Sequence, residues 1–245
     1  MNVSIFQAAA ALHANSRWQE VIAENIAASS IPGFKRQELS FDAVQAGSMP
    51  AGASRFVLPR AGTHTNFQTG PMKYTGVKTD LAIEGPGFFE VRLPNGAPGF
   101  TRDGEFHVNT LGQLVTKDGH AVLGVTGPIQ LDPNDAAPLS ISATGEISQG
   151  SDIKGQLKIV AFNDPQWLTP ISGGYFLANN PSLQIKPVTD PALRQGYLEG
   201  ANSSPIAEMA HLITAMRMFE ANQRVLQAQD ERMGQAIAAL GTVGG

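Results

Sequence analysis

Two long stretches of the chain carry apolar residues at alternating steps of three and four positions. The first runs over residues 3–28, and five of its seven stripe positions are apolar. This spacing places them on one face of a helix. Pro32 and Gly33 are predicted to end the helix, because the residue before proline avoids the α region and glycine readily adopts a positive φ. The stripe consists of Ile5, Ala8, Leu12, Asn15, Gln19, Ile22 and Ile26.

The second stretch begins near Ser203 and continues almost to the end of the chain. Ser204 suits an N-cap, Pro205 suits the first helical position, and Glu208 places negative charge near the positive end of the helix. A helix of roughly 35 residues would be about 50 Å long. Eight of its ten stripe positions are apolar: Met209, Leu212, Met216, Phe219, Gln223, Leu226, Asp230, Met233, Ile237 and Leu240.

Each stripe is narrow and long, as in the seam of a coiled coil. A single such helix would indicate an ordinary amphipathic helix on a globular core, but one at each terminus favours a pair of helices packed as a rod. Burying a Leu or Ile side chain contributes about 1.5–3 kcal/mol, so apolar surface that one pair leaves uncovered is predicted to drive assembly. The predicted assembly interface comprises Ile5, Leu12, Ile22, Ile26, Met209, Leu212, Met216, Phe219, Leu226, Met233, Ile237 and Leu240.

The middle of the chain has the pattern of short β-strands separated by turns. Alternating apolar residues lie between the turn pairs, and Asn-Gly and Asp-Gly are strong hairpin signals. The pattern predicts an antiparallel meander closed into a small barrel or sandwich, with further strands at 139–141 and 156–162. Strands do not alternate with helices, so a nucleotide-binding α/β sheet is not expected. The turn pairs are Asn95-Gly96, Asp103-Gly104, Leu111-Gly112, Asp118-Gly119 and Thr126-Gly127.

The predicted fold class is therefore α+β, with N- and C-terminal helices paired as a coiled-coil-like rod and a central antiparallel β domain. Residues 1–30 and 203–245 would form a discontinuous helical core domain, and residues 77–190 the β domain. Residues 31–76 and 191–202 are expected to be an extended connector, since they show little periodicity and several Gly and Pro.

Composition narrows the possible functions. The 245 residues carry a net charge of -4, so no basic surface indicates nucleic acid or an anionic membrane. The absence of cysteine removes disulfides, thiolate metal sites and cysteine nucleophiles. The N-terminus has no basic region followed by an apolar run, so a cleaved signal peptide is not expected. No apolar run approaches 18 residues, so we expect no membrane insertion.

The sequence gives no positive indication of catalysis, a cofactor or a metal. None of the five histidines has a second histidine at ligand spacing. The stretch Asp132-Pro-Asn-Asp135 lacks the ordered oxygen ligands of a calcium loop. Gly85-Pro86-Gly87 resembles a phosphate-binding turn, but Pro86 lacks an amide donor and a strand rather than a helix follows. A tight turn entering a strand is the better interpretation.

Three stretches resemble the axial proteins of the bacterial flagellum, which build its rod and hook. They are ENIAASSIPGFKR at 24–36, TDLAIEGPGFFEV with FTRDGEFHVNTLGQLVTKDGHAVLG at 79–91 and 100–124, and LEGANSSPIAEMAHLITAMRMFEANQRVLQAQD at 198–230. They occur in the family's order. Ala28 stands where the family usually has Asn, and Ile31 where it usually has Thr, so the turn after the helix lacks two side-chain hydrogen bonds. The motif positions are Asn25, Ile26, Pro32, Gly33, Phe34, Lys35, Glu199 and Asn202.

The resemblance implies a structural protein without catalytic activity. The terminal helices would pair and line a helical tube, with the β domain outside, and the rod would transmit torque to the hook. The implied partners are further copies of this chain, other rod and hook subunits, the surrounding basal-body rings and the flagellar export apparatus. The chain would leave the cell unfolded by type III export and reside in the periplasm-spanning rod of the basal body.

Several alternatives stay open at this stage. A β domain over residues 77–190 is lean for a hook subunit and suits a rod protein, either at the junction of proximal and distal rod or in the distal rod. The ending DERMGQAIAALG favours the junction. Outside the family, the β domain could be a self-contained ligand-binding module, in which the terminal helices would have no role. An enzyme using carboxylates of the β domain is the least supported alternative.

Overall fold

The structure is a computed structural model that describes residues 3–45, 57–135 and 137–242. The chain divides into two compact units. The helical unit contains residues 1–27, 37–64 and 204–245, and the β unit contains residues 28–36 and 65–203. The predicted combination of a helix near each end with a β-rich middle is confirmed.

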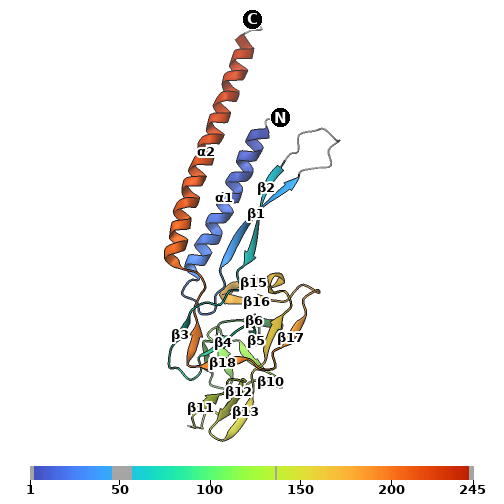
Figure 1. The fold of residues 1–245 in the computed structure, drawn as a ribbon, viewed down its shortest axis with the longest axis vertical. Coiled ribbons are helices and arrows are strands. Elements are labelled where there is room, and N and C mark those ends of the chain that lie inside the picture. The colour runs from blue at the N-terminus through green and yellow to red at the C-terminus, as the bar shows by residue number, and fades with distance from the viewer. Residues whose placement is uncertain (1–2, 46–56, 136, 243–245) are drawn as a thin grey trace. The chain divides into compact units, whose positions relative to one another are not determined.

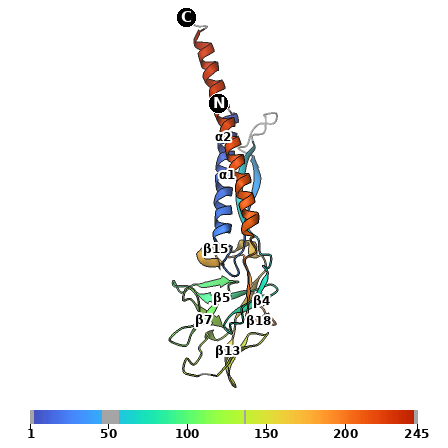
Figure 2. The ribbon, with the colours of Figure 1, turned by 90° about the vertical axis from the view of Figure 1, so that its left-hand side faces the viewer.

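The helical unit is built on two helices, α1 (Val3–Ala27) and α2 (Pro205–Thr242). They run antiparallel and pack side by side, as Figures 1 and 2 show from two directions. Because α2 has 38 residues and α1 has 25, the C-terminal part of α2 extends past the first turn of α1. Strands β1 (Gln37–Gln45) and β2 (Val57–Thr65) pair with each other, and β1 also contacts α1.

The turn that follows α1 belongs to the β unit and is held by its backbone. The amide of Ile31 donates to the carbonyl of Ala28 at 3.0 Å, and the amide of Phe34 donates to the carbonyl of Ile31 at 3.3 Å. The turn therefore forms with Ala28 and Ile31 in place, without the side-chain hydrogen bonds that those two positions lack.

The largest sheet of the β unit is open and antiparallel. Its main path has the order β15-β16-β6-β5-β9-β8-β7, with β10 beside β9, β14 beside β5 and β17 beside β14. No sheet among the described strands closes on itself, so the prediction of a closed barrel is wrong. The bounds are β5 Phe88–Arg92, β6 Pro98–Thr101, β7 Phe106–Val108, β8 Leu114–Thr116, β9 Ala121–Gly124, β10 Gly127–Pro128, β14 Ile159–Phe162, β15 Thr169–Ile171, β16 Tyr175–Leu177 and β17 Ile185–Pro187.

Four of the five predicted hairpin turns are confirmed. Gly96, Gly112, Gly119 and Gly127 all have positive φ, and the strands on either side of each turn pair as neighbours, namely β5–β6, β7–β8, β8–β9 and β9–β10. Gly127 itself is the first residue of β10. The prediction for Asp103-Gly104 is wrong, since β6 and β7 do not pair. Gly104 is needed for a different reason: a Cβ there would lie 1.8 Å from the carbonyl oxygen of Leu81.

Smaller sheets complete the β unit. The strands expected at 139–141 and within 156–162 are found as β11 and β14, and two short 3-10 turns cover 165–167 and 172–174. The stretches expected to be extended connector contain β1, β2 and β3, and also β18 and β19. The partners of β3, β18 and β19 are distant in sequence, which leaves no local signal, whereas β1 and β2 pair with each other. The remaining strands are β3 Met72–Tyr74 with β19 Tyr197–Glu199, β4 Leu81–Glu84 with β18 Ala192–Gln195, and β11 Leu139–Ile141, β12 Glu146–Gln149 and β13 Asp152–Gln156 together.

The β unit buries two apolar clusters. The larger is mainly aliphatic and includes residues of β4, β5, β8, β9, β12 and β14, with Leu81, Phe89 and Ile147 fully buried. The smaller is aromatic and gathers Phe88, Phe100 and Phe176, with Phe67 and Phe162 packed against them. Edge-to-face contacts join these rings, such as Phe88 with Phe162 at 5.6 Å between centroids. The smaller cluster adjoins the site described next, where the Arg102 guanidinium lies 5.9 Å from the Phe88 ring centroid.

Candidate functional site

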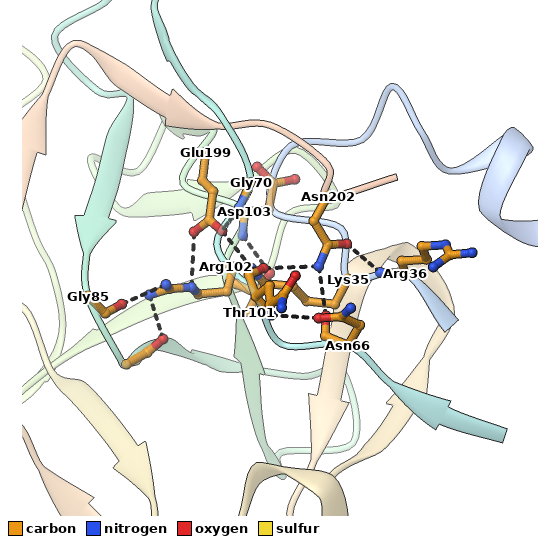
Figure 3. Close-up of polar contacts among 12 residues, drawn as sticks. Lys35, Arg36, Asn66, Gly70, Gly85, Thr101, Arg102, Asp103, Glu199 and Asn202 are labelled. Atoms are coloured by element: carbon orange, nitrogen blue, oxygen red, sulfur yellow. Dashed lines mark hydrogen bonds and ion pairs between the residues drawn. The ribbon is translucent and has the colours of Figure 1, made fainter. Parts of the chain in front are cut away.

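Three charged side chains are buried together in the β unit (Figure 3). Lys35, Arg102 and Glu199 expose 1%, 4% and 0% of their side chains. The Nζ atom of Lys35 lies 2.6 Å from Oε1 of Glu199, and Nε of Arg102 lies 3.0 Å from Oε2 of the same carboxylate. Isolated charges are not buried at this depth without partners, because desolvation costs several kcal/mol per ion. We call these three residues the ion cluster.

Backbone groups surround the ion cluster and form further hydrogen bonds with it, whereas Oε2 of Glu199 has the ion pair with Arg102 but no hydrogen bond among the described residues. Lys35 also donates to the carbonyl of Gln68 at 2.8 Å, and the amide of Gly70 donates to Glu199 at 2.9 Å. The guanidinium of Arg102 donates to the carbonyls of Gly87 at 2.8 Å and Gly85 at 2.7 Å. The ion cluster thus joins five separate segments of the chain, at residues 35, 68–70, 85–87, 102 and 199.

The turn at Gly85-Pro86-Gly87 is confirmed as a tight turn entering a strand, here β5. Gly85 and Gly87 both have positive φ. The turn presents carbonyl oxygens to the guanidinium of Arg102. A phosphate would need amide donors at this point, so the polarity of the turn suits a cation and not an anion.

Burial shifts the pKa values of the two cations in the same direction. Removal from water disfavours the charged form and lowers the pKa of Lys35 and of Arg102 below their ordinary values, and the nearby Glu199 carboxylate opposes the effect in both. A single carboxylate therefore serves two cations, which makes Glu199 the group on which the whole cluster depends.

Asn202 fastens the same region by a second set of bonds. Its side-chain oxygen accepts from the amide of Arg36 at 2.6 Å, and its side-chain nitrogen donates to the carbonyls of Asn66 at 2.7 Å and Gln68 at 2.9 Å. Its own amide donates to the carbonyl of Phe34 at 3.3 Å. Asn202 thereby ties residues 34–36 to residues 66–68, and Figure 3 shows it between Arg36 and Asn66.

Gly33 fits where no other residue can. Its φ is +69°, and a Cβ would lie 2.3 Å from the backbone carbon of Arg102 and 2.4 Å from the amide nitrogen of Asp103. Its amide donates to the carbonyl of Glu199 at 2.6 Å. Glycine is required both for the left-handed conformation and for the close backbone approach.

The predicted motif positions therefore divide between the two units. Gly33, Phe34, Lys35, Glu199 and Asn202 all take part in the site of the β unit, and Pro32 lies half-buried in the turn before it. Asn25 and Ile26 lie on α1 in the helical unit. There the buried Asn25 side chain accepts from the amide of Gln37 at 2.9 Å and donates to the carbonyl of Gln37 at 2.8 Å.

Arg102 is the central residue that sequence reasoning missed. Arg102 lies in the stretch FTRDGEF, in which the local pattern predicts only an Asp-Gly turn. Its neighbour Asp103 is also buried and accepts from Lys117 at 2.9 Å. Burial raises the pKa of Asp103, and the Lys117 ammonium opposes the rise. The available signal was two adjacent charged residues directly before a glycine, between short strands.

The predicted assembly residues lie on α1 and α2. On α1, Ile22 is buried and Leu12 and Ile26 are half-buried. On α2, Leu212, Phe219, Leu226 and Met233 are half-buried, whereas Met209 and Met216 are both 53% exposed. Ile5, Ile237 and Leu240 lie within the helices, but their side chains are outside those that the structure describes.

The less exposed face of α2 differs in part from the predicted stripe. It comprises Glu208, Leu212, Ala215, Phe219, Asn222, Leu226, Gln229 and Met233. Every second residue of the predicted stripe lies on this face. At each of the other predicted positions, the residue one place earlier in the sequence lies on the face instead. Ala215 is fully buried, because a small side chain allows another element to approach closely.

A second apolar stripe on α2 is exposed. We define the outer stripe as Ile206, Met209, Ile213 and Met216, which are between 53% and 82% exposed. Their steps of three, four and three keep them on one helix face. Exposed contiguous apolar surface of this kind marks an interaction site more often than chance exposure.

Other candidate chemistry finds no support in the described residues. No group of three or more His, Asp or Glu suited to a metal ion occurs among them. At Asp132 and Asp135 both backbone carbonyls accept hydrogen bonds from the Gln149 side chain at 2.9 Å, so these oxygens are already used. Neither described helix combines the length and the apolarity that a bilayer-spanning segment would need.

The class defined by the fold is an α+β protein whose two end segments form one helical unit and whose middle forms an open β unit. Comparison with known proteins names the family. Residues 82–149 match the family model described as flagellar hook protein FlgE/F/G D1 domain, and residues 194–239 match the flagellar basal body rod FlgEFG protein C-terminal model. These matches contain Arg102 and Glu199.

Curated relatives match over nearly the whole chain. A flagellar basal-body rod protein FlgF from Caulobacter vibrioides is 34% identical to this chain. The match covers 91% of this chain and 92% of the relative. FlgF from Escherichia coli is 31% identical over 98% and 99%, and FlgG from Agrobacterium fabrum is 32% identical over 91% and 94%. The chain belongs to the family of flagellar basal-body rod proteins. It is a structural rod subunit of the flagellar basal body. This family is not a class of enzymes.

Proposed function

We propose that this chain assembles through its terminal helices into the helical tube of the rod. The observation that carries this proposal is the outer stripe of α2, which stays exposed although the neighbouring face of the same helix is largely covered. Heptad-like steps on both faces support a coiled-coil-like pairing of α1 with α2, on which further subunits pack. Residues 1–30 and 203–245 act as the helical core domain of the assembly.

The energetics favour association over exposure. Full burial of one Met or Ile side chain contributes about 1.5–3 kcal/mol, and the outer stripe offers four such residues on each subunit. Association also costs several kcal/mol of lost freedom, so one stripe gives weak binding while repetition along a tube gives strong binding. Ile5, Ile237 and Leu240 extend the proposed interface toward the other end of the helical unit.

The test is a charge placed in the outer stripe. Met216→Asp is expected to leave the β unit folded and to prevent incorporation into basal bodies, because a carboxylate cannot be buried against apolar neighbours. Ala221→Asp is the matched control, since Ala221 is exposed on the same helix but lies outside both stripes. Incorporation is measured by immunoblotting purified basal bodies, and function by swimming in soft agar.

Normal incorporation and swimming of the Met216→Asp strain would contradict the proposed interface. Equal loss in the Ala221→Asp strain would assign the effect to general damage of α2. Leu212→Asp affects a half-buried position and is expected to disturb the helical unit itself as well as assembly.

We further propose that the chain reaches the rod by flagellar type III export without cleavage of a signal peptide, and that the assembled rod transmits torque to the hook. The family assignment and the absence of cysteine support this route. Export-dependent appearance of the uncleaved chain in basal bodies, by mass spectrometry of strains with and without the export apparatus, tests the route. Its partners would be copies of itself, neighbouring rod and hook subunits and the surrounding basal-body rings.

Among rod proteins, we propose that the chain is of the FlgF type. The two relatives from Caulobacter vibrioides allow a comparison within one organism: identity is 34% to FlgF and 31% to FlgG. Complementation of separate FlgF and FlgG deletions in that organism distinguishes the two types. Rescue of only the FlgG deletion would overturn this assignment.

A further inference from the structure

We infer that the β unit contains a binding pocket for an organic carboxylate carried on a small apolar body. The pocket has a volume of about 190 Å³ and is lined by Lys35 and Arg102 of the ion cluster together with the rings of Phe67, Phe88 and Phe162. It lies in the β unit alone, so the inference is independent of the outer stripe and of assembly.

The charge of the pocket wall is positive. Lys35 and Arg102 line the pocket, while Glu199, which neutralises only one of them, does not. All three side chains are more than nine-tenths buried, so solvent screens the remaining positive charge poorly. An anion entering the pocket would therefore meet an attractive field at close range.

Unused hydrogen-bond donors point to the same kind of ligand. The ammonium of Lys35 has three N–H donors, and its acceptors among the described residues are Glu199 and the carbonyl of Gln68. The guanidinium of Arg102 has five, of which one on each terminal nitrogen donates to the carbonyls of Gly87 and Gly85, while Nε forms an ion pair with Glu199 without a hydrogen bond. Lys35 Nζ and both terminal nitrogens of Arg102 therefore have at least one acceptor each, and the N–H groups that remain on them can serve an anion in the pocket.

The aromatic part of the pocket lining suits an apolar body. Phe67 and Phe88 meet at 5.8 Å between ring centroids, Phe88 and Phe162 at 5.6 Å, and the Arg102 guanidinium lies 5.9 Å from the Phe88 ring centroid. Water alone would satisfy the donors but would leave this aromatic surface poorly solvated. A carboxylate attached to one aromatic or branched aliphatic group satisfies both walls and matches the volume.

The probe is benzoate in its fluorinated form, 4-fluorobenzoate, and the control is the corresponding neutral amide, 4-fluorobenzamide. Both are titrated into the full chain. We expect saturable binding of 4-fluorobenzoate by fluorine NMR with a dissociation constant below about 10 mM, and at least about ten-fold weaker binding of 4-fluorobenzamide. The Nε–H resonance of Arg102 should shift with benzoate and not with benzamide. Equal binding of the two probes, or no saturable binding of benzoate, would overturn the inference and leave water as the occupant.

A filling variant tests the location without touching the ion cluster. Ala161 on β14 lines the pocket, so Ala161→Leu is expected to abolish benzoate binding. Ala192→Leu adds the same methyl groups at an exposed position on β18 and should bind like the wild type. Unchanged binding in the Ala161→Leu variant would overturn the assignment to this pocket.

Two sources could supply such a carboxylate, a free small molecule or the C-terminus of a polypeptide. N-acetylphenylalanine and its amide represent the second source in the same titration. Tighter binding of N-acetylphenylalanine than of benzoate assigns the site to a polypeptide carboxylate, and the reverse order assigns it to a free small acid.

Discussion

Lys35 and Glu199 stand 164 residues apart in the sequence, and Nζ of the one lies 2.6 Å from Oε1 of the other. The same carboxylate also lies 3.0 Å from Nε of Arg102. One buried anion thus holds two buried cations, and the segments that carry them come from the beginning, the middle and the end of the β unit. Because one anion pairs with two cations, removing the anion and removing one cation should have different effects on stability.

Removing the shared anion should cost more than removing one cation. Glu199→Gln leaves Lys35 and Arg102 buried without a counter-charge and is expected to destabilise the β unit by about 3–5 kcal/mol. Lys35→Met leaves the Arg102–Glu199 pair intact and should cost clearly less. The free energy of unfolding is measured by urea titration with Trp167 fluorescence in a Trp18→Phe background, because the chain has two tryptophans.

A larger loss for Lys35→Met than for Glu199→Gln would contradict Glu199 as the group on which the cluster depends, because methionine keeps the apolar stem and removes only the charge of Lys35. Glu199→Asp serves as a second variant, since it keeps the charge but shortens the reach to both cations.

Gly33 and Gly96 separate the cost of a positive φ from the cost of close backbone approach. Both have positive φ, at +69° and +80°, but a Cβ on Gly96 would have nothing within 4 Å while one on Gly33 would lie 2.3 Å from the backbone of Arg102. Gly96→Ala is expected to cost about 1–2 kcal/mol. Gly33→Ala should cost several kcal/mol more, because the backbone of residues 102–103 must move.

The same urea titration measures both glycine variants. Similar losses for the two would indicate that the turn containing Gly33 can shift away from Arg102 without penalty, and would contradict the close approach as the reason for glycine.

The raised pKa of Asp103 predicts how the stability of the β unit depends on pH. Its pKa is raised above 3.8 in the folded protein, so the folded state binds its proton more tightly than the unfolded state. Its contribution to stability is therefore greatest below about pH 3.8 and falls as the pH rises through the folded-state pKa. In Asp103→Asn this fall should be absent, so the stability of the variant relative to the wild type should increase over that range.

Lys117→Met provides the opposite control. Without the ammonium that lowers the pKa of Asp103, the pKa should rise further, and the loss of stability on raising the pH should become larger. Unfolding free energies at several pH values between 3.5 and 7 test both variants. Parallel curves for the wild type and Asp103→Asn would show that Asp103 does not titrate in this window.

Asn25 links the end of α1 to the first residue of β1 within the helical unit. Its side chain bonds both backbone groups of Gln37. Asn25→Asp keeps an acceptor for the amide of Gln37 but loses the donor to its carbonyl, and should cost about 1–3 kcal/mol. Amide hydrogen exchange at residues 37–40 is expected to accelerate, whereas exchange in β5 should not change. Unaltered exchange at residues 37–40 would contradict the link.

Local patterns identified most elements of this fold. The steps of three and four in both helices, the Pro-Gly after α1, and four turns with glycine in the left-handed region were all readable, because each depends on neighbouring residues alone. The one failed turn, Asp103-Gly104, shows the limit of such rules. Its glycine is required by the carbonyl of Leu81, a contact that no local pattern contains.

The sequence by itself determined the helix at each end, the short strands between, and, through the resemblance of three stretches, the family. Only the tertiary structure decided that Lys35, Arg102 and Glu199 share one buried site, that the largest sheet stays open, and that Met209 and Met216 remain exposed while Ala215 is covered. The physical reason is the same for all three. Burial, sheet closure and the pairing of buried charges depend on which distant segments meet, and a pattern of neighbouring residues records only which face or turn a residue prefers.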